Sequence, residues 1–232
     1  MNGILARANF EKAVSIFYNA FNRDGAGRII NPTFDPISAF KLTQSTLRVE
    51  QPLVTNSTQY QFPVLVNVNN GSSTQFNTEL RLNMQDSFVP TEIFIGVGKP
   101  ASTTDTKWRP QTYENPAIFT AAASSELLNI WNGGTLEIKV NKDVKLTNWD
   151  VDRHYFAPQT QQTAAAGPGS PLNQVNAADD GWYPLEPYIL MIGSQGIQIT
   201  VNLQNAIATV DANSRMIVRM RGVLAQNSTV VS

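Results

Sequence analysis

Apolar residues recur along the first 24 positions at the spacing of a helix. Leu5, Phe10, Val14, Phe17 and Phe21 follow one another at intervals near three and four, which places them on one helical face. Glycines then end the segment, as is favoured just past a helix C-terminus. The pattern predicts an amphipathic helix over residues 1–24. Its apolar stripe must pack on its own domain, on a neighbouring subunit or on a membrane surface.

Residues 25–40 separate this helix from the rest of the chain and contain two prolines. The residue before a proline is pushed toward β or polyproline geometry, so an extended arm is predicted. Pro32, Phe34 and Pro36 are expected to fix this arm along a surface.

From residue 41 onward the pattern changes to the short alternating runs typical of β-strands. Residues 91–98 are almost continuously apolar, as expected for a strand covered on both faces. Residues 117–132 form one further helix, which two glycines end. A short strand is also expected within residues 152–158. The remaining strands are predicted at residues 42–50, 59–68, 76–84, 187–194, 196–203 and 215–226, with one or two more within residues 135–149.

The order of these elements favours an all-β sandwich. No strand–helix–strand alternation appears, which argues against a parallel α/β fold, and a jelly roll fits best. Residues 99–116 and 157–182 are predicted to be long surface loops.

Composition points toward assembly with other subunits. Charged residues make up only 15% of the chain, and 22 Asn and 15 Gln outnumber the 17 basic and 18 acidic residues. Such a surface repels copies of itself weakly. The net charge of −1 gives no general affinity for nucleic acid, and without cysteine neither disulfides nor thiolate metal sites can form.

Catalytic and metal-binding chemistry finds little support. The single histidine, His154, follows Asp150 and Asp152 at alternate positions, and on a strand the three would share a face as weak metal candidates. A solvated strand end or a polar contact between subunits is favoured instead. No nucleophile elbow, zinc motif or P-loop occurs. A protein that is not an enzyme and has no cofactor is therefore expected.

Two sets of residues suggest binding. Trp108 and Trp182 lie in predicted loops and could contact a carbohydrate or another outer partner. Arg215, Arg219 and Arg221 share one face of a strand by parity. They are interpreted as an inter-subunit ion-pair surface or a solvated face rather than a nucleic-acid site. Three arginines are weak evidence for nucleic-acid binding in a chain whose net charge is −1.

The C-terminal strands resemble a known family. Residues 186–194, 196–203 and 215–227, ending in Ile-Val-Arg-Met-Arg-Gly-Val-Leu, are similar to the closing strands of major capsid proteins of lipid-containing icosahedral bacteriophages. The resemblance implies a double jelly roll and trimeric capsomers. It also implies an N-terminal helix at the inner face of the shell, near an internal membrane.

The number of rolls stays open between two alternatives. Two rolls need about sixteen strands, and the pattern predicts ten to twelve, which suits one elaborated roll of a penton or vertex protein. The long chain and N-terminal helix favour a compact double roll. Its first roll would span residues 41–142, including the helix at 117–132, and its second residues 143–232.

The expected function is that of a structural subunit of an icosahedral phage capsid. It would self-assemble around the genome and any internal membrane, with other virion proteins such as the penton as partners and without sequence-specific nucleic-acid binding. The chain lacks a signal-peptide pattern, so synthesis in the host cytoplasm and location in the virion are expected. A carbohydrate- or receptor-binding β-sandwich is the competing class. The residues expected to make inner-face or assembly contacts are Arg7, Phe10, Lys12, Val14, Phe17, Phe21, Arg23 and Arg28.

Overall fold

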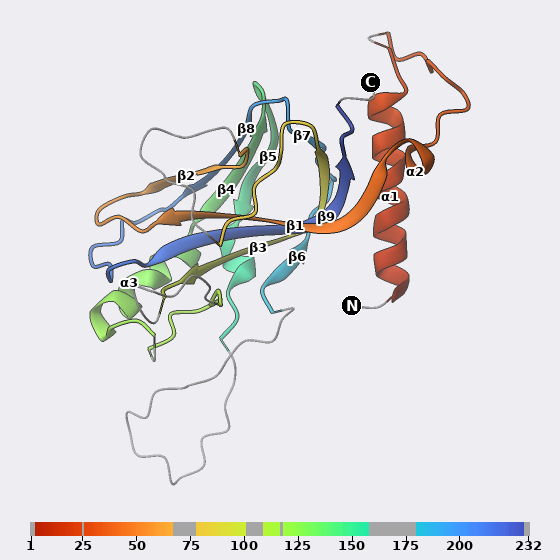
Figure 1. The fold of residues 1–232 in the computed structure, drawn as a ribbon. Coiled ribbons are helices and arrows are strands. Elements are labelled where there is room, and N and C mark those ends of the chain that lie inside the picture. Colours follow the sequence, from red (N-terminus) through yellow and green to blue (C-terminus); the bar gives the residue numbers. More distant parts are fainter. Residues whose placement is uncertain are drawn as a thin grey trace.

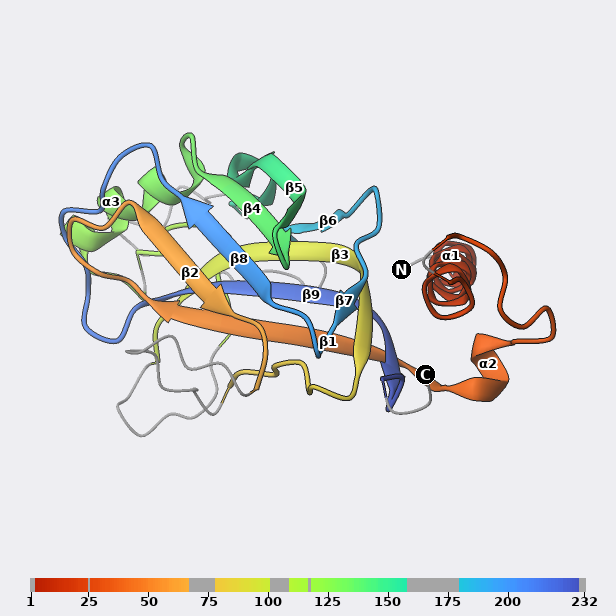
Figure 2. The same ribbon diagram turned by 90° about the horizontal axis from the view of Figure 1, so that it is seen from above.

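The computed structural model describes residues 3–24, 26–66, 78–100, 109–116, 118–157 and 180–229. Two antiparallel sheets face each other as a sandwich, and a long helix stands beside one end of it (Figures 1 and 2). The helices are α1 (Gly3–Phe21), α2 (Pro36–Ala39) and α3 (Ala121–Trp131), with a 3₁₀-helix η1 (Val151–His154).

Each sheet is ordered in a way that interleaves distant parts of the chain. The first sheet has the order β1 (Lys41–Pro52), β9 (Arg215–Gln226), β3 (Ser87–Gly98) and β6 (Trp182–Pro184), and the short β7 (Met191–Ile192) also pairs with β3. The second sheet has the order β2 (Gln59–Pro63), β8 (Ile197–Asn202), β4 (Thr135–Val140) and β5 (Asp143–Asp150).

The predicted all-β sandwich is confirmed at this level. The boundary predicted at residue 142 does not separate the sheets, because each contains strands from both sides of it. The last strand, β9, lies between β1 and β3 and pairs with β1 from Lys41 to Pro52. The described strands thus form one two-layer body rather than two bodies consecutive in sequence.

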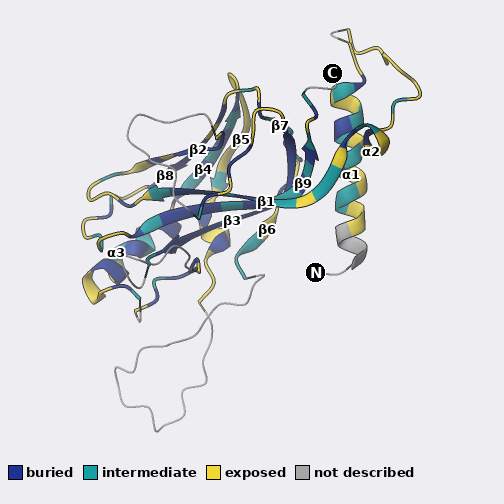
Figure 3. Ribbon diagram, in the orientation of Figure 1, coloured by how far each residue is buried: buried dark blue, intermediate teal, exposed yellow. Residues whose placement is uncertain are grey.

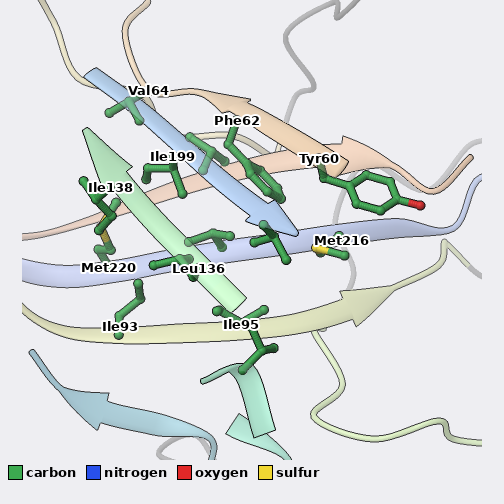
Figure 4. Packing of buried hydrophobic residues seen from close by; sticks show 14 of the residues in the cluster. Tyr60, Phe62, Val64, Ile93, Ile95, Leu136, Ile138, Ile199, Met216 and Met220 are labelled. Carbon is green, nitrogen blue, oxygen red and sulfur yellow. The ribbon is translucent and has the colours of Figure 1, made fainter. Parts of the chain in front are cut away.

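One hydrophobic core fills the space between the sheets (Figure 4). Alternation puts Leu136 and Ile138 of β4 inside, while their neighbours along the strand are only partly buried. Opposite them lie Ile95 of β3 and Met220 of β9, and Phe62 of β2 closes one side. Full burial of each such side chain contributes about 1.5–3 kcal/mol, so this layer supplies most of the driving force for folding.

Strand β3 is buried along its whole length, which confirms the prediction for residues 91–98 and extends the strand back to Ser87. A β-bulge between Pro90 and Glu92 shifts its register against β9. Because one extra residue reverses the alternation, Phe88 and Ile93 both face the core although their numbers differ in parity.

Some predicted elements are corrected by the structure. The described part of 76–84 is not a strand: Leu80 and Leu82 form only isolated bridges to β1 and to residue 65. The predicted strand at 187–194 is reduced to β7, since this segment passes from the first sheet toward the second. The strand predicted at 59–68 ends at Pro63, with 67–68 outside the described residues.

The predicted helix at 117–132 is confirmed over a shorter range as α3. It ends before Gly133, whose φ of 79° is a left-handed conformation that glycine adopts without strain. Residues 152–158 contain no strand, because the 3₁₀-helix η1 occupies the first three of them and 155–157 have no regular structure, with 158 outside the described part.

Candidate functional site

The outer face of the first sheet is divided into an apolar end and a charged middle. Odd-numbered residues of β9 face outward, and along this face Arg219 and Arg221 give way to Val223 and Ala225. The apolar end continues across the neighbouring strands and is covered by α1 (Figure 3). We call the side chains buried there the helix cluster, and its fully or largely buried members are Ala13, Phe17, Phe40, Val89, Val223 and Ala225.

Helix α1 docks through a narrow stripe centred on Ala13 and Phe17, both with no exposed surface. Phe10 and Phe21, which were predicted to make assembly contacts, pack beside them on the chain's own sheet, and the Phe21 ring meets Phe40 edge-on at 5.1 Å between centroids. Val14 is half-buried but is not a member of the cluster. At 100° per residue, Ala13 and Val14 lie at equal angles on opposite sides of the line through Phe10 and Phe17, and the helix is turned so that the Ala13 side, with Ile16, faces the sheet.

The arm after α1 folds back along the helix, and its end forms α2, which corrects the wholly extended arm predicted over residues 25–40. The Asn22 side chain donates to the carbonyl of Asn31 at 2.7 Å and accepts from its backbone N–H at 2.8 Å. Phe34 then packs against Tyr18 and Phe40, with ring centroids 6.2 and 5.8 Å apart. Two points of the arm, Asn31 and Phe34, are therefore tied to the helix.

The prolines of the arm have different environments. Pro36 is buried in the first turn of α2, where a proline costs no hydrogen bond, and Asp35 caps this helix by accepting from the Ile37 N–H. Pro32 is exposed. The arm also exposes three isoleucines, Ile29, Ile30 and Ile37, at 50, 65 and 58%.

The basic residues expected to face partners are exposed, and three of them already contact groups of this chain. Arg7 pairs with Glu11 at 2.9 Å along the helix. Lys12 pairs with Glu186 at 3.1 Å, and Arg23 donates to the Gly27 carbonyl at 2.8 Å. The fourth, Arg28, is exposed at the turn of the arm. Their net positive charge is thus partly balanced within the chain.

Two hollows flank α1 where it meets the sandwich. One, of about 210 Å³, lies between Phe10 and the charged middle of the sheet near Arg221. The other, of about 350 Å³, lies between Ile16 and the β4–β5 hairpin. Asn9 lines the first hollow and Tyr188 lines the second, and the Tyr188 hydroxyl donates to the Asn9 side chain at 2.7 Å between the two hollows. The helix therefore touches the sandwich along a ridge.

The weak metal candidates do not form a metal site. Asp150 ends β5, and Asp152 and His154 belong to η1, so the expected alternation on one strand is wrong. His154 is fully buried: its Nε2 accepts from the Trp149 indole at 3.0 Å, and its Nδ1 donates to the Gly181 carbonyl at 2.8 Å. Both ring nitrogens are engaged, so neither can bind a metal ion.

Burial also sets the charge of His154. Loss of solvation lowers its pKa to about 4, because the apolar surroundings disfavour the imidazolium. The neutral ring acts as a structural link between Trp149 and Gly181. Across the described ranges, no group of three or more acidic or histidine side chains could hold a metal ion.

Trp182 lies in β6 rather than in a loop, and its ring is part of the charged middle. The Arg221 guanidinium lies 4.5 Å from its ring centroid, and Phe94 packs at 5.6 Å. Trp108, the other predicted outer contact, lies outside the described residues. Trp182 therefore has protein side chains against its ring, where a sugar platform would need an open face.

Sequence reasoning found the aromatic residues of α1 but missed the surface that receives them. Val223 and Ala225 follow the arginines at the same parity, and this change from charged to apolar on one face is a signal the sequence contains. Val89 could not be assigned to this face, because the bulge beside it reverses the alternation.

Within the described part of the chain, no helix combines the length and apolar composition needed to cross a bilayer. No protein-family model, no curated protein and no solved structure matches this chain.

Proposed function

We propose that this chain is a structural shell subunit, as its C-terminal strands suggest by resemblance, whose function is to bury surface against copies of itself. The observation that carries the proposal is the module formed by α1 and its arm. This module packs on a small separate cluster at the edge of the sandwich, and it presents three isoleucines to solvent within nine residues. Concentrated apolar exposure of this kind favours a protein partner.

We further propose that the sandwich is one jelly roll rather than two. Without the two-residue β7, the described part of the chain contains eight strands, four in each sheet. Counted along the chain, these are the first, eighth, third and sixth in one sheet and the second, seventh, fourth and fifth in the other. This interleaving is the pattern of two nested Greek keys, and it supports a single-roll subunit such as a shell or vertex protein.

The remaining expectations stay predictions. Trimeric capsomers, contact with penton or other virion proteins, and an inner position of α1 near lipid or the genome follow from the resemblance. The glycan-binding alternative gains no support from Trp182, whose ring contacts Arg219, Arg221 and Phe94.

The decisive experiment measures particle mass and fold together. The full chain should sediment as trimers or larger particles, and a chain lacking residues 1–24 should keep its β-type circular dichroism but assemble poorly. A full chain that stays monomeric at all concentrations, or normal particles from the truncated chain, would contradict the proposal.

A matched pair of variants isolates the arm. Replacing Ile29, Ile30 and Ile37 together by Ser removes exposed apolar surface without touching the helix cluster, and we expect a marked loss of assembly. Replacing Val54 and Val144 by Ser removes similarly exposed apolar residues, at 56 and 47%, from elsewhere on the sandwich. Equal losses in the two variants would show that the arm has no special role.

A further inference from the structure

A single row of cross-strand partners crosses the charged middle of the outer face. Arg48 of β1 lies opposite Arg219 of β9, which lies opposite Phe94 of β3, which in turn lies opposite Trp182 of β6. Two like charges directly opposite each other destabilise a sheet. The Arg48–Arg219 pair at the β1 end of this row is therefore stabilised by any compensating negative charge.

The neighbouring arginines have such charges within the chain. Arg48 and Arg215 both bind the buried carboxylate of Glu50, at 2.7 and 3.2 Å, and Arg221 pairs with Glu92. Arg219 forms no ion pair with any residue in the described ranges, and its Nε is buried without a hydrogen-bond partner. Of the two arginines in the row, Arg48 has a carboxylate partner and Arg219 has none among the described residues.

Aromatic rings hold the Arg219 side chain in place. Its guanidinium lies 5.1 Å from the ring centroid of Trp182 and 5.8 Å from that of Phe94. Desolvation by burial, followed by the nearby charges of Arg48 and Arg221, lowers the pKa of this group. A cation held in this way is already fixed in position, so an incoming anion would find it with little loss of entropy.

We propose that Arg219, with Arg48 beside it, binds a carboxylate of a second copy of this chain. A planar guanidinium with free donors matches a carboxylate, which can accept two parallel hydrogen bonds from it. The inference rests on the proposed self-assembly and names one of its contacts.

Charge balance favours a second copy over nucleic acid. The outer face concentrates four arginines, at positions 48, 215, 219 and 221, around Glu50 and Glu92. Taking these from the chain's 17 basic and 18 acidic residues leaves 13 basic and 16 acidic residues elsewhere. The rest of each copy is thus complementary to this face, whereas a chain of net charge −1 has no general attraction for a polyanion.

The test compares two arginines that both stack on tryptophan. Arg153 lies 5.0 Å from the ring centroid of Trp149 but has a carboxylate in its own chain, Asp150 at 3.8 Å. Sedimentation equilibrium of the full chain at about 50 and 300 mM NaCl should show association weakened about tenfold by Arg219→Gln, with a reduced salt dependence. Arg219→Lys should lose less, because it keeps the charge without the planar fork, and Arg153→Gln should associate like the unmodified chain.

Thermal melting of each variant, followed by circular dichroism, establishes that it is folded. If folded Arg219→Gln associates like the unmodified chain, the inference is wrong and the proposed function stands. If Arg153→Gln weakens association as much as Arg219→Gln, the effect is one of general charge and the inference is also wrong. If the unmodified chain does not associate at all, the proposed function itself is overturned, and the second copy with it.

Discussion

The main core and the helix cluster bury apolar side chains in different ways. The main core lies between two sheets and is enclosed by strands from the whole length of the chain. The helix cluster lies on the outside of one sheet, and among the α1 residues whose burial is described, from Arg7 to Phe21, only Ala13 and Phe17 are completely buried in it. The main core is therefore buried by the two sheets of this chain. At the helix cluster, by contrast, much of the surface of α1 and its arm stays exposed to solvent.

This difference predicts that the two regions unfold separately. A helix held by a shallow cluster has few contacts to lose, so it should open at lower free energy than the sandwich. Four changes test this expectation.

Phe62→Ala should destabilise the whole sandwich. Phe62 is 1% exposed in the centre of the main core, and its truncation leaves a cavity that the surrounding strands cannot fill. We expect a loss of about 3–5 kcal/mol in urea unfolding. A loss below about 1 kcal/mol would show that this core is no better packed than the helix cluster.

Acidification should weaken the sandwich through His154. Its pKa is about 4 in the folded protein, against 6.5 for a solvated histidine in the unfolded chain, so folding favours the neutral ring. The resulting stability is fully present above pH 6.5 and is lost as the pH falls through 4. The shift corresponds to roughly 3 kcal/mol.

Urea unfolding between pH 7 and pH 4 measures this effect. His154→Gln should be less stable at pH 7 and should lose less stability across that range than the unmodified chain. Identical pH profiles for the two proteins would contradict the assignment.

Phe17→Ala should release α1 and leave the sandwich folded. Phe17 is the largest fully buried side chain of the helix, and we expect a loss of about 2–3 kcal/mol, because a shallow site can partly collapse around the cavity. Trypsin should then cut at Arg23 faster, while the thermal midpoint of the strands changes little. Val14→Ala is the matched control and should leave cleavage unchanged, since Val14 lies outside the cluster.

Lys12→Ala should have the smallest effect. The Lys12–Glu186 pair joins α1 to the sandwich, but both side chains are more than half exposed and water screens their attraction. Protection of the α1 amides from hydrogen exchange should match that of the unmodified chain at physiological salt. A clear loss of protection would mean that charge, rather than the helix cluster, holds the helix.

The sequence was informative wherever a local pattern decides the structure. The boundaries of β9 and the shared helical face of Phe10, Phe17 and Phe21 follow from periodicity alone, but the surface on which this face docks does not. The pairing of β1 with β9 does not, because it joins segments about 170 residues apart and depends on the whole fold. The role of His154 was also hidden, since its two hydrogen-bond partners, Trp149 and Gly181, are brought to it by tertiary structure.

The position of β9 has a consequence for synthesis on the ribosome. This strand is the last of the sandwich to be translated, and it occupies a central place between β1 and β3. Until it emerges, β1 and β3 each lack the neighbour that joins them, so the first sheet cannot close. Folding dominated by such distant pairings is slow. A nascent chain that lacks β9 also lacks Val223 and Ala225, so α1 cannot dock fully on the sandwich until translation has passed this strand.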